Sequence, residues 1–343
     1  MSIVSIRSSL FTAALLTLPS AHAASEFATS IVQFNPGSNA NPSFPAPNLL
    51  GGPQGGGITN GSLDVVVLGT GGSITVGFNV PIQDGPGADF IAFENGFSFA
   101  APSDIFTEVA FAEVSSDGVN FARMPSRFAG PPSVQPPFGT LPMGTFAGMV
   151  GGMPVVANVL SNSIPPEDPV RAGGEAFDLA ALQAHPMVLG GQLDLQAVQF
   201  VRFVDVVEGV ASDSYGNVIY DNGGATGSAD LDAVAVINHP ATVTSGQPVC
   251  DLSIDATGHL VLRLGDPNGI SDLDFSTLRA SFNLIEFSFF SVLPAFVPTG
   301  FDGNIYEFTT VGPVMGAGLT GAFAMSVSDH VGGFSADQVM VQG

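Results

Sequence analysis

Residues 68–97 read LGTGGSITVGFNVPIQDGPGADFIAFENGF, and this stretch decides the fold class. Ser73–Phe78 alternates apolar with small or polar residues, the period of two that places the apolar side chains of a half-buried strand on one face. A second run, Phe90–Phe93, follows a turn rich in Gly, Pro and Asp. The prolines and glycines confine Asp84 and Asp89 to turn or strand-edge backbone. The stretch therefore predicts two strands and an acidic connection.

A second block has the same order of parts. Residues 225–236 read ATGSADLDAVAV, in which a glycine-containing loop precedes Asp230, Asp232 and an alternating strand. Residues 198–207 (VQFVRFVDVV) have the composition of a buried strand. These segments extend the prediction of β structure over the first two thirds of the chain.

Two hairpins are predicted from turn residues. Leu63–Leu68 and Ser73–Phe78 flank a Gly-Thr-Gly-Gly turn, and Glu108–Ser115 and Val119–Met124 flank a turn that contains Asp117-Gly118. Asp-Gly between two alternating runs is among the strongest short-range hairpin signals.

The composition predicts an all-β protein with two domains. The 43 glycines and 26 prolines are typical of many short strands joined by tight turns, and 343 residues exceed what one core usually organises. Residues 240–248 (PATVTSGQP) have linker composition. We expect a signal peptide (1–23), a jelly-roll-like β-sandwich (24–240), a linker (241–249) and a smaller immunoglobulin-like β-sandwich (250–343).

The N-terminus has the three parts of a secretory signal peptide. Arg7 is followed by the apolar run Leu10–Leu18 and by Ala21-His22-Ala23, a small-x-small cleavage pattern. No later stretch reaches the roughly 20 apolar residues of a transmembrane helix. The sequence predicts an exported chain that starts near Ala24, without a transmembrane segment, and that is secreted or held at the cell surface.

The charge balance limits the partners. The chain has 7 basic and 30 acidic residues, and its net charge is −23. Nucleic acids and anionic membranes attract positive charge, so neither is an expected partner. Acidic loops rich in Gly and Asn instead favour calcium, which takes hard oxygen ligands.

The sequence predicts a calcium site in the first domain and a second acidic loop in the last. If the first and last strands of the first domain meet at an edge, one ion is shared by Asp84, Asp89, Glu94, Asp230 and Asp232. The alternative is that these acids form turns and protect strand edges. Residues 266–274 (DPNGISDLD) begin like an EF-hand loop, but the glycine falls at position 4 instead of 6, and Thr277 replaces the glutamate at position 12. An EF-hand is therefore not expected. A looser calcium loop could use Asp266, Asn268, Asp272 and Asp274.

Candidate ligand-binding and catalytic residues are few. Tyr215 and Tyr220, in the turn of residues 213–221 (DSYGNVIYD), combine an apolar face with a polar group and form the expected recognition edge. No nucleophile elbow, zinc-protease motif or phosphate loop is present. Paired glutamates among Glu94, Glu108 and Glu113 are the one arrangement that suits a glycosidase.

Several blocks together resemble a family of bacterial exported cell-surface proteins of uncharacterised function. They are GGSITVGF (71–78), DGPGADFIAFENGF (84–97), AEVSSDGVNF (112–121), FVRFVDVV (200–207) and DLDAVAVIN (230–238). The last domain resembles an immunoglobulin-like module of bacterial surface proteins. The resemblance implies a place outside the cell and adds little chemistry.

These observations predict a secreted or cell-surface, non-enzymatic binding or adhesion module that calcium stiffens, with an extracellular glycan or protein as ligand. The alternatives are an extracellular polysaccharide hydrolase that uses paired carboxylates and a structural envelope protein without a ligand.

Overall fold

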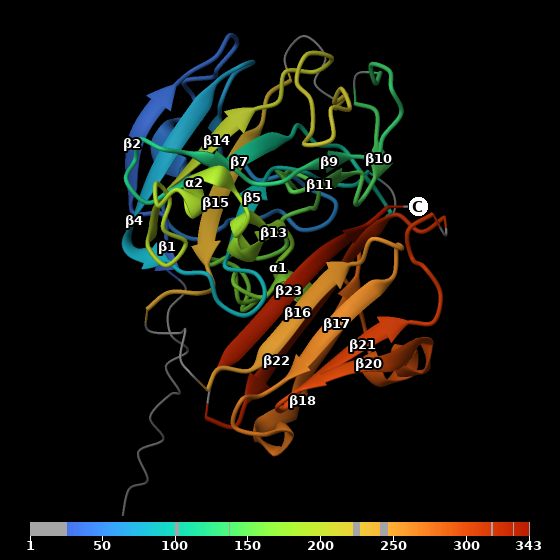
Figure 1. Cartoon of the computed structure of the whole chain (residues 1–343). Helices are drawn as coiled ribbons and strands as arrows, with labels where there is room; N and C mark the ends of the chain where they lie inside the picture. Colours follow the sequence, from blue (N-terminus) through green and yellow to red (C-terminus); the bar gives the residue numbers. More distant parts are fainter. Residues whose placement is uncertain are drawn as a thin grey trace, which may run out of the picture.

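A computed structural model describes residues 26–99, 103–136, 138–221, 227–240, 246–316, 318–331 and 333–342. The predicted signal peptide and residues 241–245 of the predicted linker lie outside these ranges. The described strands form antiparallel sheets in two groups, which we call the N-terminal unit (residues 26–238) and the C-terminal unit (residues 249–342) (Figure 1). The predicted all-β fold class is confirmed. The jelly-roll and immunoglobulin-like arrangements and the domain boundaries stay predictions.

The N-terminal unit is built from two main sheets. The first has the order β1 (Glu26–Phe27), β15 (Asp230–Val236), β5 (Phe90–Glu94), β13 (Glu175–Phe177), with β3 (Val66–Val67) beside β15. The second has the order β12 (Met149–Val150), β7 (Ala110–Ser115), β14 (Val198–Asp205), β4 (Ser73–Ile82), β2 (Ser30–Asn35), with β8 (Ala122–Arg123) beside β7. Alternating side chains of both sheets fill one core, to which Val76, Phe90 and Phe203 contribute. The apolar periodicity in the sequence predicts these inward faces.

Shorter elements connect the sheets. The two-stranded pairs are β6 (Asp104–Ile105) with β10 (Leu141–Pro142) and β9 (Arg127–Phe128) with β11 (Phe146–Ala147). The helices are η1 (Ala46–Leu49), α1 (Pro169–Ala172), η2 (Leu179–Leu182) and α2 (Pro186–Leu189). Asp178 caps η2, because its side chain accepts a hydrogen bond from the N–H of Ala180.

One predicted hairpin is confirmed and the other is wrong. β7 and β8 pair around Asp117-Gly118. The run Leu63–Leu68, however, pairs through β3 with β15, whereas β4 pairs with β2 and β14. The Gly69–Gly72 turn is fixed by distant acceptors, since Gly69 N donates to Ser228 Oγ and Gly71 N donates to Asp205 Oδ2. This turn therefore carries the chain from one sheet to the other.

The C-terminal unit has two four-stranded sheets. The first has the order β16 (Val249–Ile254), β17 (Leu260–Gly265), β21 (Ile305–Thr310), β20 (Phe296–Asp302), and the second has the order β19 (Ile285–Phe287), β18 (Leu273–Phe282), β22 (Gly321–Asp329), β23 (Phe334–Val341). Its short helices are η4 (Ile270–Asp272), α3 (Phe289–Val292) and η5 (Leu293–Ala295). Cys250, Leu262 and Met325 are fully buried in a core of their own.

The two units meet along β23, which crosses the region between them in Figure 1. Met340 of β23 packs in a small apolar cluster with Ile105 and Met143 of the N-terminal unit. We call this contact between the two units the seam. The apolar cluster excludes water from part of the seam, and acidic residues lie along the rest of it.

Candidate functional site

The five acids predicted to share one calcium ion are distributed over three places. Asp89 directly precedes β5, a strand of five residues, and Glu94 is the last residue of that strand. Because a strand rises about 3.3 Å per residue, the two side chains start roughly 16 Å apart. One ion cannot contact both, so the prediction of a single site shared by all five acids is wrong.

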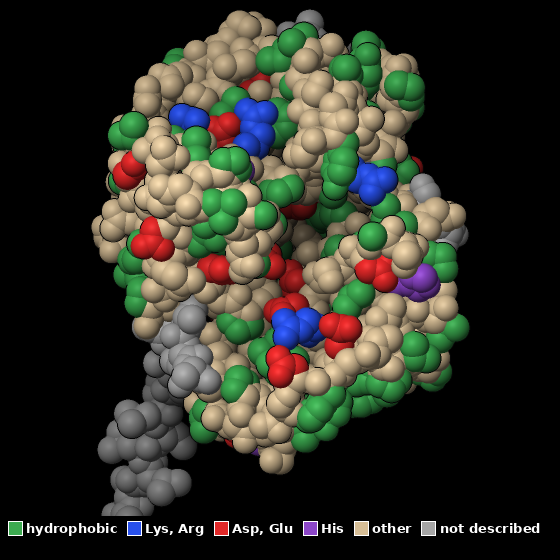
Figure 2. Space-filling view, in the orientation of Figure 1, with side chains coloured by type: hydrophobic (Ala, Val, Ile, Leu, Met, Phe, Trp, Pro, Cys, Tyr) green, Lys and Arg blue, Asp and Glu red, His purple; other side chains and the backbone are tan. Residues whose placement is uncertain are grey.

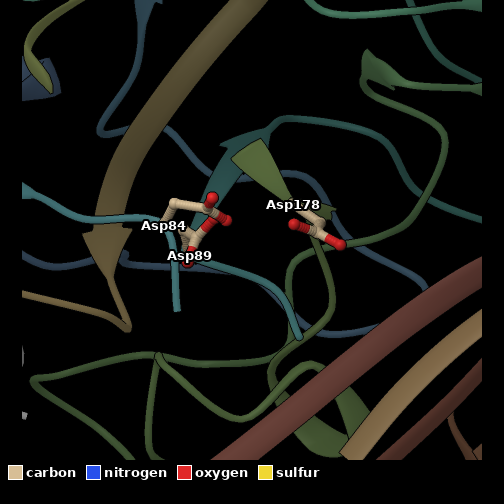
Figure 3. Close-up of side chains that lie close together, drawn as sticks. All are labelled: Asp84, Asp89 and Asp178. Carbon is tan, nitrogen blue, oxygen red and sulfur yellow. The ribbon is translucent and has the colours of Figure 1, made fainter. Parts of the chain in front are cut away.

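The first place brings Asp84 and Asp89 together with Asp178, an acid that the sequence analysis did not assign to the site (Figure 3). One carboxylate oxygen from each residue lies within 4.8 Å of the other two. Asp178 directly follows β13, and the antiparallel pairing of Phe177 with Phe90 places it opposite Asp89. Asp178 caps η2, and no local pattern in either segment predicts the pairing of β13 with β5 that brings it to Asp89.

Asp89 is fully buried, and its carboxylate is well supplied with donors. Oδ1 accepts hydrogen bonds from Gly85 N at 2.8 Å and Asn238 Nδ2 at 2.9 Å, and Oδ2 accepts one from Leu179 N at 2.7 Å. Burial and the nearby charge of Asp178 nevertheless raise the pKa of Asp89 well above its usual range. These hydrogen bonds give Asp89 a structural role, because they hold the turn before β5 in place. Calcium binding at this cluster stays a prediction.

The cluster continues across the seam. Burial and then the charge of Asp178 raise the pKa of Asp337 on β23, and burial, together with the nearby charges of Asp251 and Asp84, raises the pKa of Asp178 to about 7. Figure 2 shows acidic side chains gathered in the hollow between the two units. The seam therefore holds several carboxylates that repel one another when all are ionised.

The second place joins Glu94 and Asp230 with Glu108. Glu94 is buried, and its two oxygens accept hydrogen bonds from Thr107 Oγ1 at 2.9 Å and Asp230 N at 3.3 Å. Burial and the charge of Asp230 raise the pKa of Glu108 to about 8, and burial raises that of Asp230 to about 7. Burial and the neighbouring negative charges thus favour the protonated forms of these three acids.

Asp232 forms the third place, because its hydrogen-bond partner differs from those of the other four acids. Both of its oxygens accept the N–H of Gln54 at 3.1 Å, and the side chain of Gln54 donates to Asp64. Burial raises the pKa of Asp232 to about 7. Asp232 therefore ties the loop around Gln54 to β15, a structural role that differs in detail from the alternative of turn-forming and edge-protecting acids.

Two acids of the second predicted loop lie close together in the structure, and a third acid from another segment joins them. Asp266 and Asp272 lie together, but the third carboxylate of the group comes from Asp329 at the end of β22. Asp274 is not in the group; its Oδ1 accepts hydrogen bonds from the N–H and hydroxyl of Ser276. Asp274 belongs to β18 and pairs with Ser328 of β22. Asn268 contacts Asp272 through its side chain at 3.4 Å.

Tyr215 lies at a cleft between the two units, and Tyr220 does not line it. The cleft has a volume of about 640 Å³ and is lined by Tyr215 and Arg127 from the N-terminal unit and by Asp255, Thr257 and Gln342 from the C-terminal unit, among other residues. The ring of Tyr220 instead packs against the core cluster around Val109 and Ile219. The prediction of a recognition edge therefore applies to Tyr215 alone.

The side chains at the cleft are held by fixed partners. Asp213 is buried and accepts hydrogen bonds from the N–H groups of Tyr215 and Asn217, both at 2.9 Å, which fixes the turn that carries Tyr215. The guanidinium carbon of Arg127 lies 5.8 Å from the centre of the Tyr215 ring. Hydrogen bonds from Thr257 and His259 lower the pKa of Asp255 to about 2. The cleft thus presents an aromatic ring, a cation and a carboxylate that stays ionised.

The glutamates considered for hydrolysis do not form one group. Glu113 lies on the sheet of β7 and makes ion pairs with Arg123 at 3.0 Å and Arg202 at 2.6 Å. Glu94 and Glu108 remain as a pair, because the charge of Glu108 contributes to the raised pKa of Glu94 after burial and Asp230.

No protein-family model matches the chain, and no curated protein matches it in a sequence search. Among the described residues, no helix is long and apolar enough to cross a membrane.

Proposed function

We propose that the chain is an exported, non-enzymatic binding module, secreted or held at the cell surface, whose ligand occupies the cleft at Tyr215. The observation that carries this proposal is that Tyr215 of the N-terminal unit and Asp255 and Thr257 of the C-terminal unit line one cleft of about 640 Å³. Clefts of this size suit small ligands or single units of a longer chain. The predicted signal peptide and the resemblance to exported surface proteins support the location.

The chemistry of the lining favours a polyhydroxylated ligand such as a glycan. The Tyr215 side chain is 74% exposed, so its ring can stack on the apolar face of a sugar. Arg127 and Asp255 offer donors and acceptors for hydroxyl groups. Gln342 is buried, and within the described part of the chain no donor reaches its Oε1. A ligand hydroxyl at this position would satisfy that acceptor.

Binding is favoured over hydrolysis at this cleft. Among the described residues that line it, Asp255 is the one acid, whereas glycoside hydrolysis ordinarily needs a pair of carboxyl groups. A general acid also needs a raised pKa, and the pKa of Asp255 is lowered by its hydrogen bonds to Thr257 and His259. The lining can therefore orient a ligand but has no proton to give.

The experiment is a glycan-array screen of the chain from Ala24 onward, followed by calorimetry with the ligands found. Tyr215→Ala should abolish binding, and Arg127→Ala should weaken it. Phe138→Ala is the matched control, because Phe138 is 73% exposed on the surface and does not line the cleft. No glycan bound by the wild-type chain, or equal binding by Tyr215→Ala, would show that the cleft does not recognise glycans.

Hydrolysis of polysaccharide is the second candidate, and the raised pKa of Glu108 is the observation that favours it. A carboxyl group with a pKa of about 8 is protonated at neutral pH and could act as a general acid. Release of reducing ends from a polysaccharide, lost in Glu108→Gln and retained in Tyr215→Ala, would establish this alternative. A chain that neither binds nor cleaves glycans would fit the structural envelope protein.

A further inference from the structure

Three carboxylates meet at one end of the C-terminal unit, where two connections lie side by side. Asp266 follows β17, Asp272 ends η4 just before β18, and Asp329 ends β22. One oxygen of each side chain lies within 4.8 Å of the other two. Calcium binds oxygen at about 2.3–2.6 Å, so two oxygens on one ion are at most about 5 Å apart. The spacing therefore fits a single ion.

Asp266 shows that this group lacks a partner. Its side chain is completely buried, and Oδ1 accepts a hydrogen bond from Asn268 N at 2.7 Å. Oδ2 is also buried, and no donor among the described residues reaches it. The two charged groups that act on the Asp266 carboxylate are Asp272 and Asp329, and both are negative. A buried carboxylate oxygen without a donor is costly unless a cation or a proton neutralises it.

Backbone hydrogen bonds hold the carboxylate of Asp329 and the main chain of Asp272 in place. Asp329 Oδ1 accepts the N–H groups of Val331 at 2.9 Å and Gly333 at 2.7 Å, which fixes the turn between β22 and β23. The two connections are tied together, because His330 N donates to the carbonyl of Asp272 at 2.9 Å. The carboxylates are thus brought together by bonds that do not depend on an ion.

We propose that Asp266, Asp272 and Asp329 bind one calcium ion, with water completing its coordination. All three offer hard oxygen ligands, and three negative charges exceed the charge of the ion. Loops and a turn supply the ligands, which suits the variable coordination of calcium better than the near-ideal octahedron that magnesium requires.

The position of the site gives the ion a structural role. Asp266 extends from the sheet of β16 and β17, and Asp329 belongs to the sheet of β18 and β22. The side chain of Asn268 also donates to the carbonyl of Gly246, in the segment that connects the two units. The ion therefore joins both sheets of the C-terminal unit next to the end of that segment. The site is separate from the Tyr215 cleft, and this inference does not rest on the proposed function.

The test is calorimetric titration of the chain from Ala24 onward with CaCl₂ and with MgCl₂, after treatment with EDTA and its removal. We expect one calcium ion per chain, and weaker binding of magnesium. Asp272→Asn should weaken calcium binding by about tenfold or more, because it removes one of the three charged ligands. Asp272 is partly exposed, so this substitution leaves the buried residues in place. Asp274→Asn is the matched control in the same segment and should change the affinity by less than about twofold.

A second variant separates this site from the acids at the seam. Asp178→Asn should leave the calcium affinity unchanged. Loss of binding in Asp178→Asn with retention in Asp272→Asn would overturn the proposal and place the ion at the seam. A wild-type chain that takes up no calcium at millimolar concentrations would also overturn it.

Thermal unfolding gives an independent readout. Calcium at about 100 times its dissociation constant should raise the folding equilibrium constant about 100-fold. The resulting rise in melting temperature should be absent in Asp272→Asn and present in Asp274→Asn. A rise of equal size in both variants would contradict the assignment of Asp272 as a ligand.

Discussion

The backbone N–H of Ala88 donates a 2.9 Å hydrogen bond to the carbonyl of Ala336, so β23 of the C-terminal unit holds the turn that leads into β5. Gly87 forms an isolated parallel bridge with the same residue, and Ser335 Oγ donates to the carbonyl of Pro86 at 3.1 Å. The acidic turn identified from the sequence is therefore part of the contact between the two units. Unfolding of one unit removes hydrogen-bond partners from the other.

Gly87→Ala should weaken this contact. Gly87 has φ +74°, and a Cβ atom there would lie 2.4 Å from the carbonyl oxygen of Ala336. Left-handed backbone with a side chain costs about 1 kcal/mol, and displacement of a packed strand adds about 1–3 kcal/mol. We expect the free energy of unfolding to fall by about 2–4 kcal/mol in total. Calorimetry should show a lower melting temperature and, where the units separate, two transitions.

Gly303→Ala is the control for Gly87→Ala. Gly303 has φ +64°, and nothing lies within 4 Å of the position that its Cβ would take. Its loss should cost about 1 kcal/mol from the backbone alone. Equal destabilisation by the two variants would mean that the contact between Gly87 and Ala336 contributes nothing to stability.

Stability should fall as the pH rises from about 5 to 8 in the presence of a chelator. Burial raises the pKa of Asp178 to about 7, and burial with the charge of Asp230 raises that of Glu108 to about 8. Between the ordinary pKa of a carboxyl group, about 4, and these values, the folded chain binds more protons than the unfolded chain. The stability that these groups contribute is therefore present at low pH and lost as the pH rises. Melting temperatures across this range measure the effect.

Asp178→Asn should flatten this pH dependence. The amide oxygen of Asn can still accept the N–H of Ala180, which Asp178 Oδ1 accepts at 2.7 Å. The variant should be about as stable as the wild-type chain at pH 5 and roughly 1 kcal/mol more stable at pH 8. Asp194→Asn is the control, because Asp194 is exposed and accepts the N–H of Gln196 in the same way. An unchanged pH profile in Asp178→Asn would exclude the residue as a source of the effect.

Glu113→Gln should destabilise the N-terminal unit. Glu113 Oε2 lies 2.6 Å from Arg202 Nη2 and Oε1 lies 3.0 Å from Arg123 Nη2, and the Glu113 side chain is 9% exposed. Without the carboxylate, Arg123 and Arg202 lose the negative charge that they share. Both remain partly in water, so we expect a loss of about 1–2 kcal/mol in chemical denaturation.

Glu286→Gln is the matched control for Glu113→Gln. Glu286 also pairs with two arginines, Arg171 at 3.3 Å and Arg279 at 4.0 Å, but its side chain is 46% exposed. Exposed ion pairs are worth less than about 1 kcal/mol, so its loss should change the stability by about 0.5 kcal/mol or less. If the two variants lost equal stability, burial of Glu113 would not strengthen its pairs.

Local patterns in the sequence predict many of the strands correctly. The alternation over Ser73–Phe78 corresponds to β4, and the runs at 90–93 and 198–207 correspond to β5 and β14. Asp117-Gly118 predicts its hairpin. These features depend on residues a few positions apart, where side-chain period and turn chemistry act directly.

The sites depend on contacts between distant segments, and local sequence patterns do not predict these contacts. Asp178 reaches Asp89 through the pairing of β13 with β5, and Asp329 reaches Asp266 from the other sheet of its unit. Residues close in sequence can also lie at different sites. The extended strand β5 keeps Asp89 and Glu94 apart, and Asp274 belongs to β18 and not to the loop before it.

The sequence by itself determined the β architecture, the acidic surface and the supply of candidate oxygen ligands, because these follow from composition and from local period. Only the tertiary structure decided which carboxylates meet, and that Tyr215 and Asp255 line the same cleft between the units. Pairing between strands far apart in the chain is chosen by the burial of whole sheet faces. No short stretch of residues carries that choice.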